Sequence, residues 1–219
     1  MRDTLSTSIK VTRSILAARL DRAEASRPTR DRPRDRFPAT DTFLAGTSRH
    51  VGAVNAVLVP AVRRRLPDGH DAAAELVRLS RRLEDAMFQA KSKLYGSAYA
   101  VGRPWASIWA DVHERFDDLL TLEEALVARI VDATDELHCG ELTERLYRAE
   151  LDAPTRPHPH LPHQGVRGRV ARRVAHGVDR FWDAAEGRMI PEPVRIHDHH
   201  HDSRLTQYLL AQTRLPEEE

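Results

Sequence analysis

The sequence contains a single cysteine, Cys139, and it has no glycine-rich loop. One cysteine excludes an intramolecular disulfide and any metal site built from several thiolates, and this usage fits a reducing cytoplasm. The ten glycines are scattered, so none of them forms a phosphate-binding turn between a strand and a helix. The sequence therefore gives no support to nucleotide-dependent chemistry.

Long apolar segments are also missing. The longest apolar run, 51–62, is interrupted by Asn55 and Pro60, and it is shorter than the roughly 20 residues that a spanning helix needs. The N-terminus has no unbroken apolar stretch and so indicates neither a signal peptide nor a transit peptide. We therefore expect a cytoplasmic protein with no membrane span.

The charges do not favour one sign. Lys and Arg together number 34 and Asp and Glu 33, which gives a net charge of +1. The whole chain therefore has no electrostatic bias toward nucleic acid, and no nucleic-acid partner is expected. Lysine occurs only at Lys10, Lys91 and Lys93, and this arginine bias, together with the alanine content, suggests a GC-rich bacterial genome.

Apolar residues recur at helical spacing along most of the chain, and no segment shows the alternation of a strand. This pattern predicts an all-α protein with helices over 4–26, 41–66, 71–95, 104–131, 136–151 and 166–189. The four helices between 41 and 151 are expected to form an antiparallel four-helix bundle, with Pro60 kinking the first of them.

Five divisions of the chain follow from these patterns. They are an N-terminal helix in 1–27 whose thin apolar stripe predicts loose docking, a Pro- and Arg-rich linker in 28–40, the bundle in 41–152, a Pro- and His-rich segment with an amphipathic helix packed on the bundle in 153–196, and a tail in 197–219.

Two ionisable residues lie on predicted apolar faces. At about 100° per residue, His50 falls within the apolar stripe of helix 41–66, and Glu123 falls near the centre of the stripe of helix 104–131. An ionisable group on a buried face is costly unless it is paired, hydrogen-bonded or bound to a metal. These two residues are therefore the leading candidates for a buried site.

Segment 41–150 resembles a known family in three features. They are an in-stripe histidine on the first helix, a helix that ends Leu94-Tyr95-Gly96, and the pair Glu123-Glu124. Together these features resemble the hemerythrin-like (HHE cation-binding) bundles. The resemblance implies a non-haem di-iron centre inside the bundle, held by histidines and carboxylates that include His-x-x-x-Glu pairs, and a role in oxygen binding or redox stress.

The ligand set implied by this resemblance is incomplete. Ala86 and Ala90 stand where the second-helix His-x-x-x-Glu would fall, and Leu119 or Leu120 stands four residues before the Glu pair. Alanine and leucine cannot ligate a metal, so a complete di-iron site is not expected.

A reduced metal site remains one interpretation. One iron or zinc ion would be held by His50 and Glu123 together with His113 or Glu84, because such an ion needs three or four nitrogen and oxygen ligands. The function would then be oxygen or redox sensing. The alternative is metal-free, with a His50–Glu123 hydrogen bond or a Glu123–Arg pair that fixes the register of the helices.

The segment 154–189 offers a possible surface for a protein partner. Its helix 166–189 has an arginine-rich polar face that would suit an acidic partner or the surface of an anionic membrane, although packing of its valine stripe on the bundle also fits. Two histidine clusters, His158, His160 and His163 and then His199, His200 and His201, lack the spacing of a defined metal site.

No set of residues favours an enzyme. Cys139 follows His138, but neighbouring residues on a helix point about 100° apart and no third orienting group is evident. Two functions therefore stand open, a metal-binding sensor using His50 and Glu123, and a metal-free scaffold that binds a partner through 154–189. The oligomeric state cannot be read from the sequence.

Overall fold

The structure is a computed structural model that describes residues 4–26, 31, 36–96, 102–158, 174–179 and 192–193. Its helices are α1 (Thr4–Ala25), α2 (Arg36–Ala53), the π-helical turn η1 (Val54–Leu58), α3 (Val59–Arg65), α4 (Gly69–Leu94), α6 (Trp105–Asp132) and α7 (Glu136–Leu151). No strand occurs among these residues, which confirms the all-α prediction for them. None of the described helices combines the length and the apolar character needed to cross a membrane.

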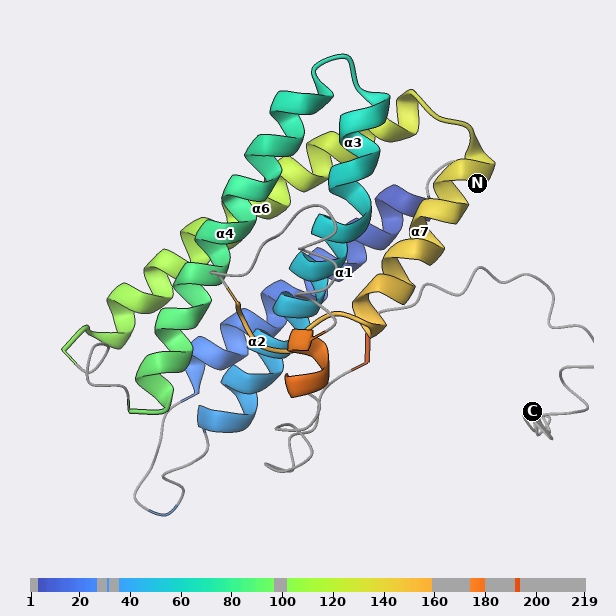
Figure 1. Ribbon diagram of the computed structural model, residues 1–219. Coiled ribbons are helices and arrows are strands. Elements are labelled where there is room, and N and C mark those ends of the chain that lie inside the picture. Colours follow the sequence, from blue (N-terminus) through green and yellow to red (C-terminus); the bar gives the residue numbers. More distant parts are fainter. Residues whose placement is uncertain are drawn as a thin grey trace, which may run out of the picture.

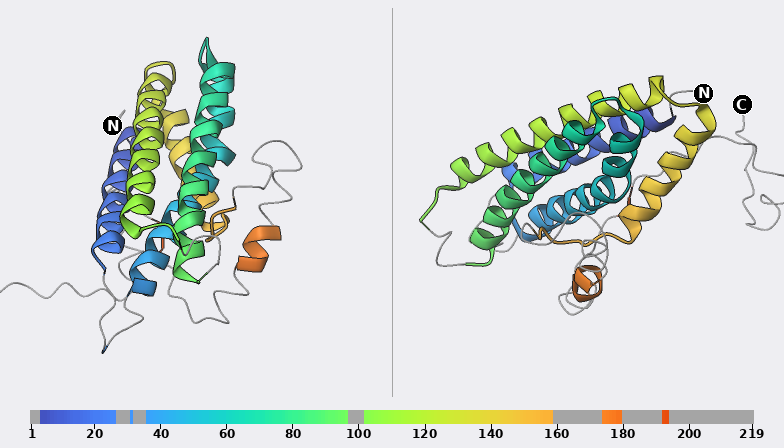
Figure 2. Two further views of the ribbon diagram at one scale, coloured as in Figure 1. Left: turned by 90° about the vertical axis from the view of Figure 1, so that its left-hand side faces the viewer. Right: turned by 45° about the horizontal axis from the view of Figure 1, so that its top comes forward.

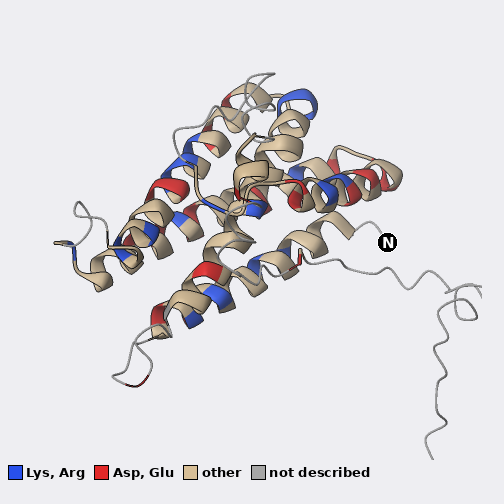
Figure 3. Ribbon diagram, turned by 60° about the horizontal axis from the view of Figure 1, so that its bottom comes forward, with Lys and Arg blue, Asp and Glu red and all other residues tan. Residues whose placement is uncertain are grey.

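The long helices lie side by side (Figures 1 and 2), and the contacts between successive helices form a closed ring, called the closed order below. Helix α1 packs on α2 and α6, α4 packs on α6, and α2 and α3 pack on α4. Helix α7 contacts α1, α2 and η1 and lies outside this order. Acidic and basic residues are interspersed over much of the ribbon (Figure 3), and their numbers nearly balance over the whole chain.

Pairs of contacts at both ends show that α4 and α6 run antiparallel. Asp68, just before α4, pairs with Arg129 near the end of α6. Lys93, near the end of α4, lies 5.8 Å from the ring centroid of Trp105 at the start of α6. Helix α4 ends at Leu94, and Gly96, two residues later, has a φ of 76°, a left-handed conformation that favours glycine.

Helix α2 begins at Arg36, so the predicted linker 28–40 extends too far. Pro38 is tolerated there because the first turn of a helix has no use for its missing N–H. Asp41 lies inside this helix, and its carboxylate accepts a hydrogen bond from the Tyr95 hydroxyl at 3.1 Å. This hydrogen bond joins the first half of α2 to the residue that follows α4.

Pro60 is accommodated by the π-helical turn that precedes it. In η1 the wider turn is closed by the Val59 N–H, which donates to the carbonyl of Val54, five residues earlier. A proline inside an α-helix removes one hydrogen bond and its ring clashes with the carbonyl four residues before, and a π turn relieves both problems locally. The distortion predicted at Pro60 is therefore a widened turn between α2 and α3.

The expectation that the N-terminal helix docks loosely is wrong. One face of α1 is buried, and it consists of Leu5, Ile9, Thr12, Leu16, Leu20 and Ala23. Arg13 also pairs with Asp117 and Glu124 of α6. The apolar stripe of α1 is weak in the sequence because the rest of the helix carries many Ser, Thr and Ala residues, so its two faces differ little in polarity.

Candidate functional site

His50 bridges two carboxylates that come from different helices. Its Nε2 lies 2.9 Å from Glu123 Oε2 of α6, and its Nδ1 lies 2.8 Å from Glu150 Oε1 of α7. The exposed fractions of His50, Glu123 and Glu150 are 2%, 0% and 8%, so the whole group is buried. The structure therefore brings the two leading sequence candidates into contact and adds a third residue, Glu150. We call these three residues the buried triad.

The histidine of the buried triad is a cation at neutral pH. Burial disfavours the charged imidazolium, but the charges of Glu123 and Glu150 and their hydrogen bonds outweigh it and raise the pKa of His50 to about 10. Both ring nitrogens therefore carry a proton and donate it, one to each carboxylate. An imidazolium in this state has no lone pair left for a metal ion.

Arg19 adds a fourth charged group next to the buried triad. Burial lowers the pKa of the half-buried Arg19 on α1, while the nearby charge of Glu150 opposes this effect. The charges thus alternate from Glu123 in the core through His50 and Glu150 to Arg19. Such pairing is what makes buried charges tolerable, because each carboxylate has a cation beside it.

A pocket opens beside the buried triad, between α1, α2 and α7. It is open to solvent, its enclosed part has room for about one water molecule, and it is lined by Thr12, Ile15, Leu16, Arg19, Gly46, Arg49, His50, Glu150, Glu192 and Pro193. The absence of a side chain at Gly46 leaves room for the Arg19 guanidinium group, because a Cβ at Gly46 would lie 2.5 Å from Arg19 Nη1. The pocket therefore brings two guanidinium groups and an imidazolium to one space.

The predicted metal-ligand set does not fit the structure. Within the described ranges, no three His, Cys, Asp or Glu side chains are grouped so that they could hold a metal ion. His113 contacts Glu24 of α1 at 2.8 Å instead, and it precedes Glu123 by ten residues, which is about 15 Å along a helix. An angle around a helix gives the face of a residue but not its level relative to residues of other helices, so helical angles alone do not establish which of these residues meet.

Glu84, the fourth predicted ligand, is buried in α4 with an exposed fraction of 7%. Burial, and to a lesser extent the charge of Asp85, raises the pKa of Glu84 to about 8, against the opposing effect of Arg81. Glu84 is therefore mostly protonated at neutral pH. Its role in the fold is that of a buried neutral group.

We expect Glu84→Gln to stabilise the protein at alkaline pH. The folded pKa of about 8 lies above the ordinary value of 4.5, so stability conferred by the proton is lost as pH rises from 4.5 through 8. At pH 9 the Gln variant should be about 2–4 kcal/mol more stable than the parent, and near pH 4 the two should be alike. Urea denaturation across this range measures the difference. Glu114→Gln, which removes a carboxylate with 58% side-chain exposure, is the control and should change little.

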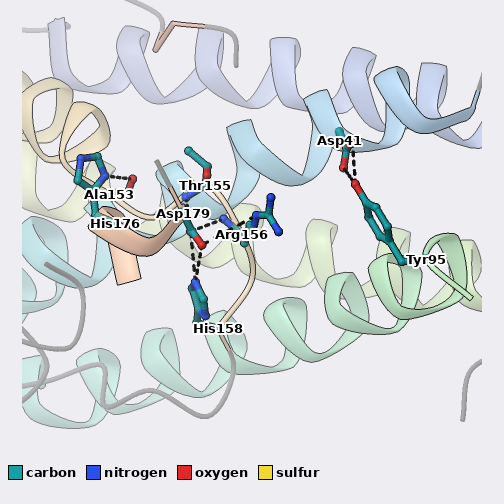
Figure 4. A network of polar contacts seen from close by, with 8 residues as sticks. All are labelled: Asp41, Tyr95, Ala153, Thr155, Arg156, His158, His176 and Asp179. Atoms are coloured by element: carbon teal, nitrogen blue, oxygen red, sulfur yellow. Dashed lines mark hydrogen bonds and ion pairs between the residues drawn. The ribbon is translucent and has the colours of Figure 1, made fainter. Parts of the chain in front are cut away.

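The segment after α7 is held by a buried carboxylate, as Figure 4 shows. Asp179, with an exposed fraction of 1%, accepts hydrogen bonds from the backbone N–H groups of Thr155 at 2.9 Å and Arg156 at 3.0 Å. His158 Nε2 lies 3.2 Å from the same carboxylate. The short helical turn 174–179 is thereby fastened to the chain that leaves α7.

In the turn 174–179, which these hydrogen bonds hold in place, the valines of the predicted apolar stripe face the solvent. Val174 and Val178 are 62% and 49% exposed, whereas Ala175 is buried beside Asp179. The prediction that the stripe packs on the bundle is therefore wrong at these two positions, because the hydrogen bonds of Asp179 fix the rotation of the turn. The rest of helix 166–189, His160, His163 and the tail 197–219 lie outside the described residues.

The sequence interpretation missed Glu150, Arg19 and Arg49. A signal existed for two of them, since Glu150 follows Leu146 by four residues and Arg19 follows Leu16 by three, which places each near a buried face. A comparison of the chain with protein-family models, with curated proteins and with solved structures found no match. The site is therefore interpreted from its own geometry.

Proposed function

We propose that this protein is a helical ligand-binding protein whose pocket between α1, α2 and α7 takes a small anion. The observation that carries the proposal is that Arg19, Arg49 and the protonated His50 line one pocket. Guanidinium groups bind carboxylates and phosphates through paired hydrogen bonds, and a partly desolvated setting strengthens each of them. The chemical class of the ligand is therefore a small carboxylate or phosphate.

The buried triad supports this function by shaping the inner wall of the pocket. Glu150 lines the pocket, but its Oε1 is engaged by His50, which reduces its repulsion of an incoming anion. Glu192 also lines the pocket, so with Glu123 behind the wall the three cations are matched by three carboxylates. An incoming anion would therefore be held by hydrogen bonds from the guanidinium groups rather than by an excess of positive charge.

This proposal retains the metal-free interpretation of the sequence, but it places the binding site in the pocket between α1, α2 and α7 instead of on the surface of 154–189. Iron or zinc sensing through His50, Glu123, His113 and Glu84 is not proposed, since only His50 and Glu123 come into contact and both ring nitrogens of His50 are engaged by carboxylates. The partner surface of 154–189 is replaced by the pocket, because its described parts, 154–158 and 174–179, are joined to each other through Asp179.

For the fold, we propose a four-helix bundle made of α1, the α2–α3 unit, α4 and α6, with α7 as an outer fifth helix. The closed order of contacts among the first four supports this arrangement. The hemerythrin-like resemblance assigns the fourth position to 136–151, which is α7 here. The anion-binding proposal does not depend on that resemblance.

We expect acetate or inorganic phosphate to bind in a manner that depends on Arg49. Isothermal titration calorimetry at low salt and pH 7 should show binding to the parent protein, weakened about tenfold or more in Arg49→Gln and Arg19→Gln, because a hydrogen bond to a charged group contributes about 1.5–3 kcal/mol. Gly46→Ala should weaken binding likewise by displacing the Arg19 guanidinium.

Arg148→Gln is the matched control, since Arg148 lies on α7 with 72% side-chain exposure and pairs only with Glu144 among the described residues. It should leave the affinity unchanged. The proposal is wrong if neither anion binds to the parent or to any variant, or if the Arg148 variant loses as much affinity as the Arg49 variant.

A further inference from the structure

The backbone that leaves α7 is bonded to a buried carboxylate of the turn 174–179, as Figure 4 shows. Two adjacent N–H groups, those of Thr155 and Arg156, donate to the same oxygen, Asp179 Oδ2. The Arg156 Nε lies 4.0 Å from the other oxygen, and His158 Nε2 lies 3.2 Å from Oδ2. Successive N–H groups beside a guanidinium group form a concave site that suits an anion. We call this arrangement the Asp179 clasp.

A second hydrogen bond joins the turn to the same segment at Ala153. His176 Nδ1 lies 3.1 Å from the carbonyl oxygen of Ala153, and the ring nitrogen donates because a carbonyl can only accept. Ala153 itself is buried, with an exposed fraction of 3%. The turn 174–179 therefore bonds the backbone of the segment on both sides of Pro154.

This segment packs on α2 close to the buried triad. A Cβ at Gly52 would lie 3.0 Å from the Ala153 Cβ, which is shorter than the roughly 3.5–4.0 Å of ordinary carbon–carbon contact. Gly52 follows His50 by two residues, and Ala153 follows Glu150 by three. The close approach of the two backbones thus lies within about one helical turn of the His50–Glu150 hydrogen bond.

The helix α7 does little by itself to hold Glu150 in place. Glu150 is its last buried residue, and Leu151, which follows, is 40% exposed. The bond from His50 Nδ1 to Glu150 Oε1 is 2.8 Å long, so a displacement of about 1 Å is enough to break it. The position of Glu150 therefore depends on the segment that comes after it.

We infer that Asp179 is a positioning residue of the pocket, because its clasp holds the segment 153–158 against α2 and so keeps Glu150 bonded to His50. This inference rests on the proposed anion-binding function and adds a distant control of it. Without the clasp, Glu150 would leave His50 and its charge would face an incoming anion. The pocket would then bind the anion less tightly.

The test is Asp179→Ala, which leaves two buried N–H groups without their acceptor and so opens the clasp. In nuclear magnetic resonance spectra of the 15N-histidine-labelled full-length protein, the Nδ1 proton of His50 should lose its resonance, while the Nε2 proton, bonded to Glu123, should keep its own. The Nδ1 resonance is identified as the one that Glu150→Gln shifts. Loss of one resonance but not the other distinguishes positioning from general destabilisation.

Asp152→Ala is the matched control, because it removes an exposed carboxylate of the same segment. It should retain both resonances. In titrations with acetate and with inorganic phosphate, Asp179→Ala should bind about 2–30-fold more weakly than the parent, and Asp152→Ala should bind like the parent. If Asp179→Ala keeps both His50 resonances, or loses both together, the inference is overturned.

A change of side-chain size tests the same contact without altering Asp179. Gly52→Ala should push Ala153 away from α2 and weaken the Nδ1 resonance of His50, and it should not harm the helix, in which alanine is favoured over glycine. Adding Ala153→Gly to this variant removes the opposing methyl group and should restore the resonance. Gly52→Ala with an unchanged His50 spectrum would contradict the inference.

The inference and the proposed function fail in different ways. If Asp179→Ala loses the Nδ1 resonance but neither anion binds to the parent protein, Asp179 positions Glu150 and the anion-binding function is wrong. If Arg49→Gln weakens acetate binding while Asp179→Ala and the parent bind acetate equally, the pocket binds anions and Asp179 does not control it.

Discussion

His50→Ala is expected to lower the free energy of unfolding by about 3–5 kcal/mol at neutral pH, the usual cost of removing one partner from a buried ion pair. The substitution leaves Glu123, which is fully buried, without its cation. The other oxygen of Glu123, Oε1, makes no hydrogen bond within the described part of the chain, so no second partner compensates. Urea denaturation followed by circular dichroism measures the loss.

The pH dependence identifies the imidazolium as the cause. The folded pKa of His50, about 10, lies above its ordinary value of 6.5, so the stabilisation is complete below pH 6.5 and is lost as pH rises through 10. The slope cannot exceed about 1.4 kcal/mol per pH unit, the value for one proton. His50→Ala should lack this contribution, so the difference between the two proteins should shrink toward pH 10.

Two further variants keep this test decisive. His138→Ala removes a histidine with 50% side-chain exposure that pairs with Asp135, and it should cost less than about 1 kcal/mol. Glu123→Gln retains a hydrogen-bonding side chain without the charge, and it should be less harmful than His50→Ala because no buried anion is left unpaired. A loss within 1 kcal/mol of zero for His50→Ala would show that the buried triad does not form.

Phe43→Ala should cost about 3–5 kcal/mol, as large aromatic deletions in a packed core do. Phe43 is fully buried, and its ring centroid lies 6.3 Å from those of both Trp109 and Phe116. This contact sets α2 against α6 two turns before His50, so the variant also tests the register that brings His50 to Glu123. Chemical denaturation gives the stability, and the fluorescence of Trp109 should shift to longer wavelength as its environment opens.

Phe88→Ala provides the same chemical change at a site with 39% exposure. It should cost no more than about 1–2 kcal/mol, because much of the ring is in contact with water in the folded state. Equal losses for the two variants would contradict the placement of Phe43 between α2 and α6.

The helical class was predictable from the sequence because burial of one face imposes a 3.6-residue period on a helix. Helices α4, α6 and α7 carry that period clearly, and their observed ends lie within two residues of the predicted ones. The same period identified His50 and Glu123, since ionisable residues on an apolar face need partners. To this extent, the local pattern determined both the class and the centre of the site.

The partners themselves were decided only by the tertiary structure. Glu150 is 100 residues from His50 in the chain, and the helical period does not encode the level at which α7 crosses α2. His113 was misplaced for the same reason, because an angle around one helix says nothing about depth along another. The burial of α1 and the outward turn of Val174 and Val178 likewise depend on the surfaces that these segments contact. The sequence determines which face of a helix is apolar and becomes buried, and the packing of the helices determines which residues that face contacts.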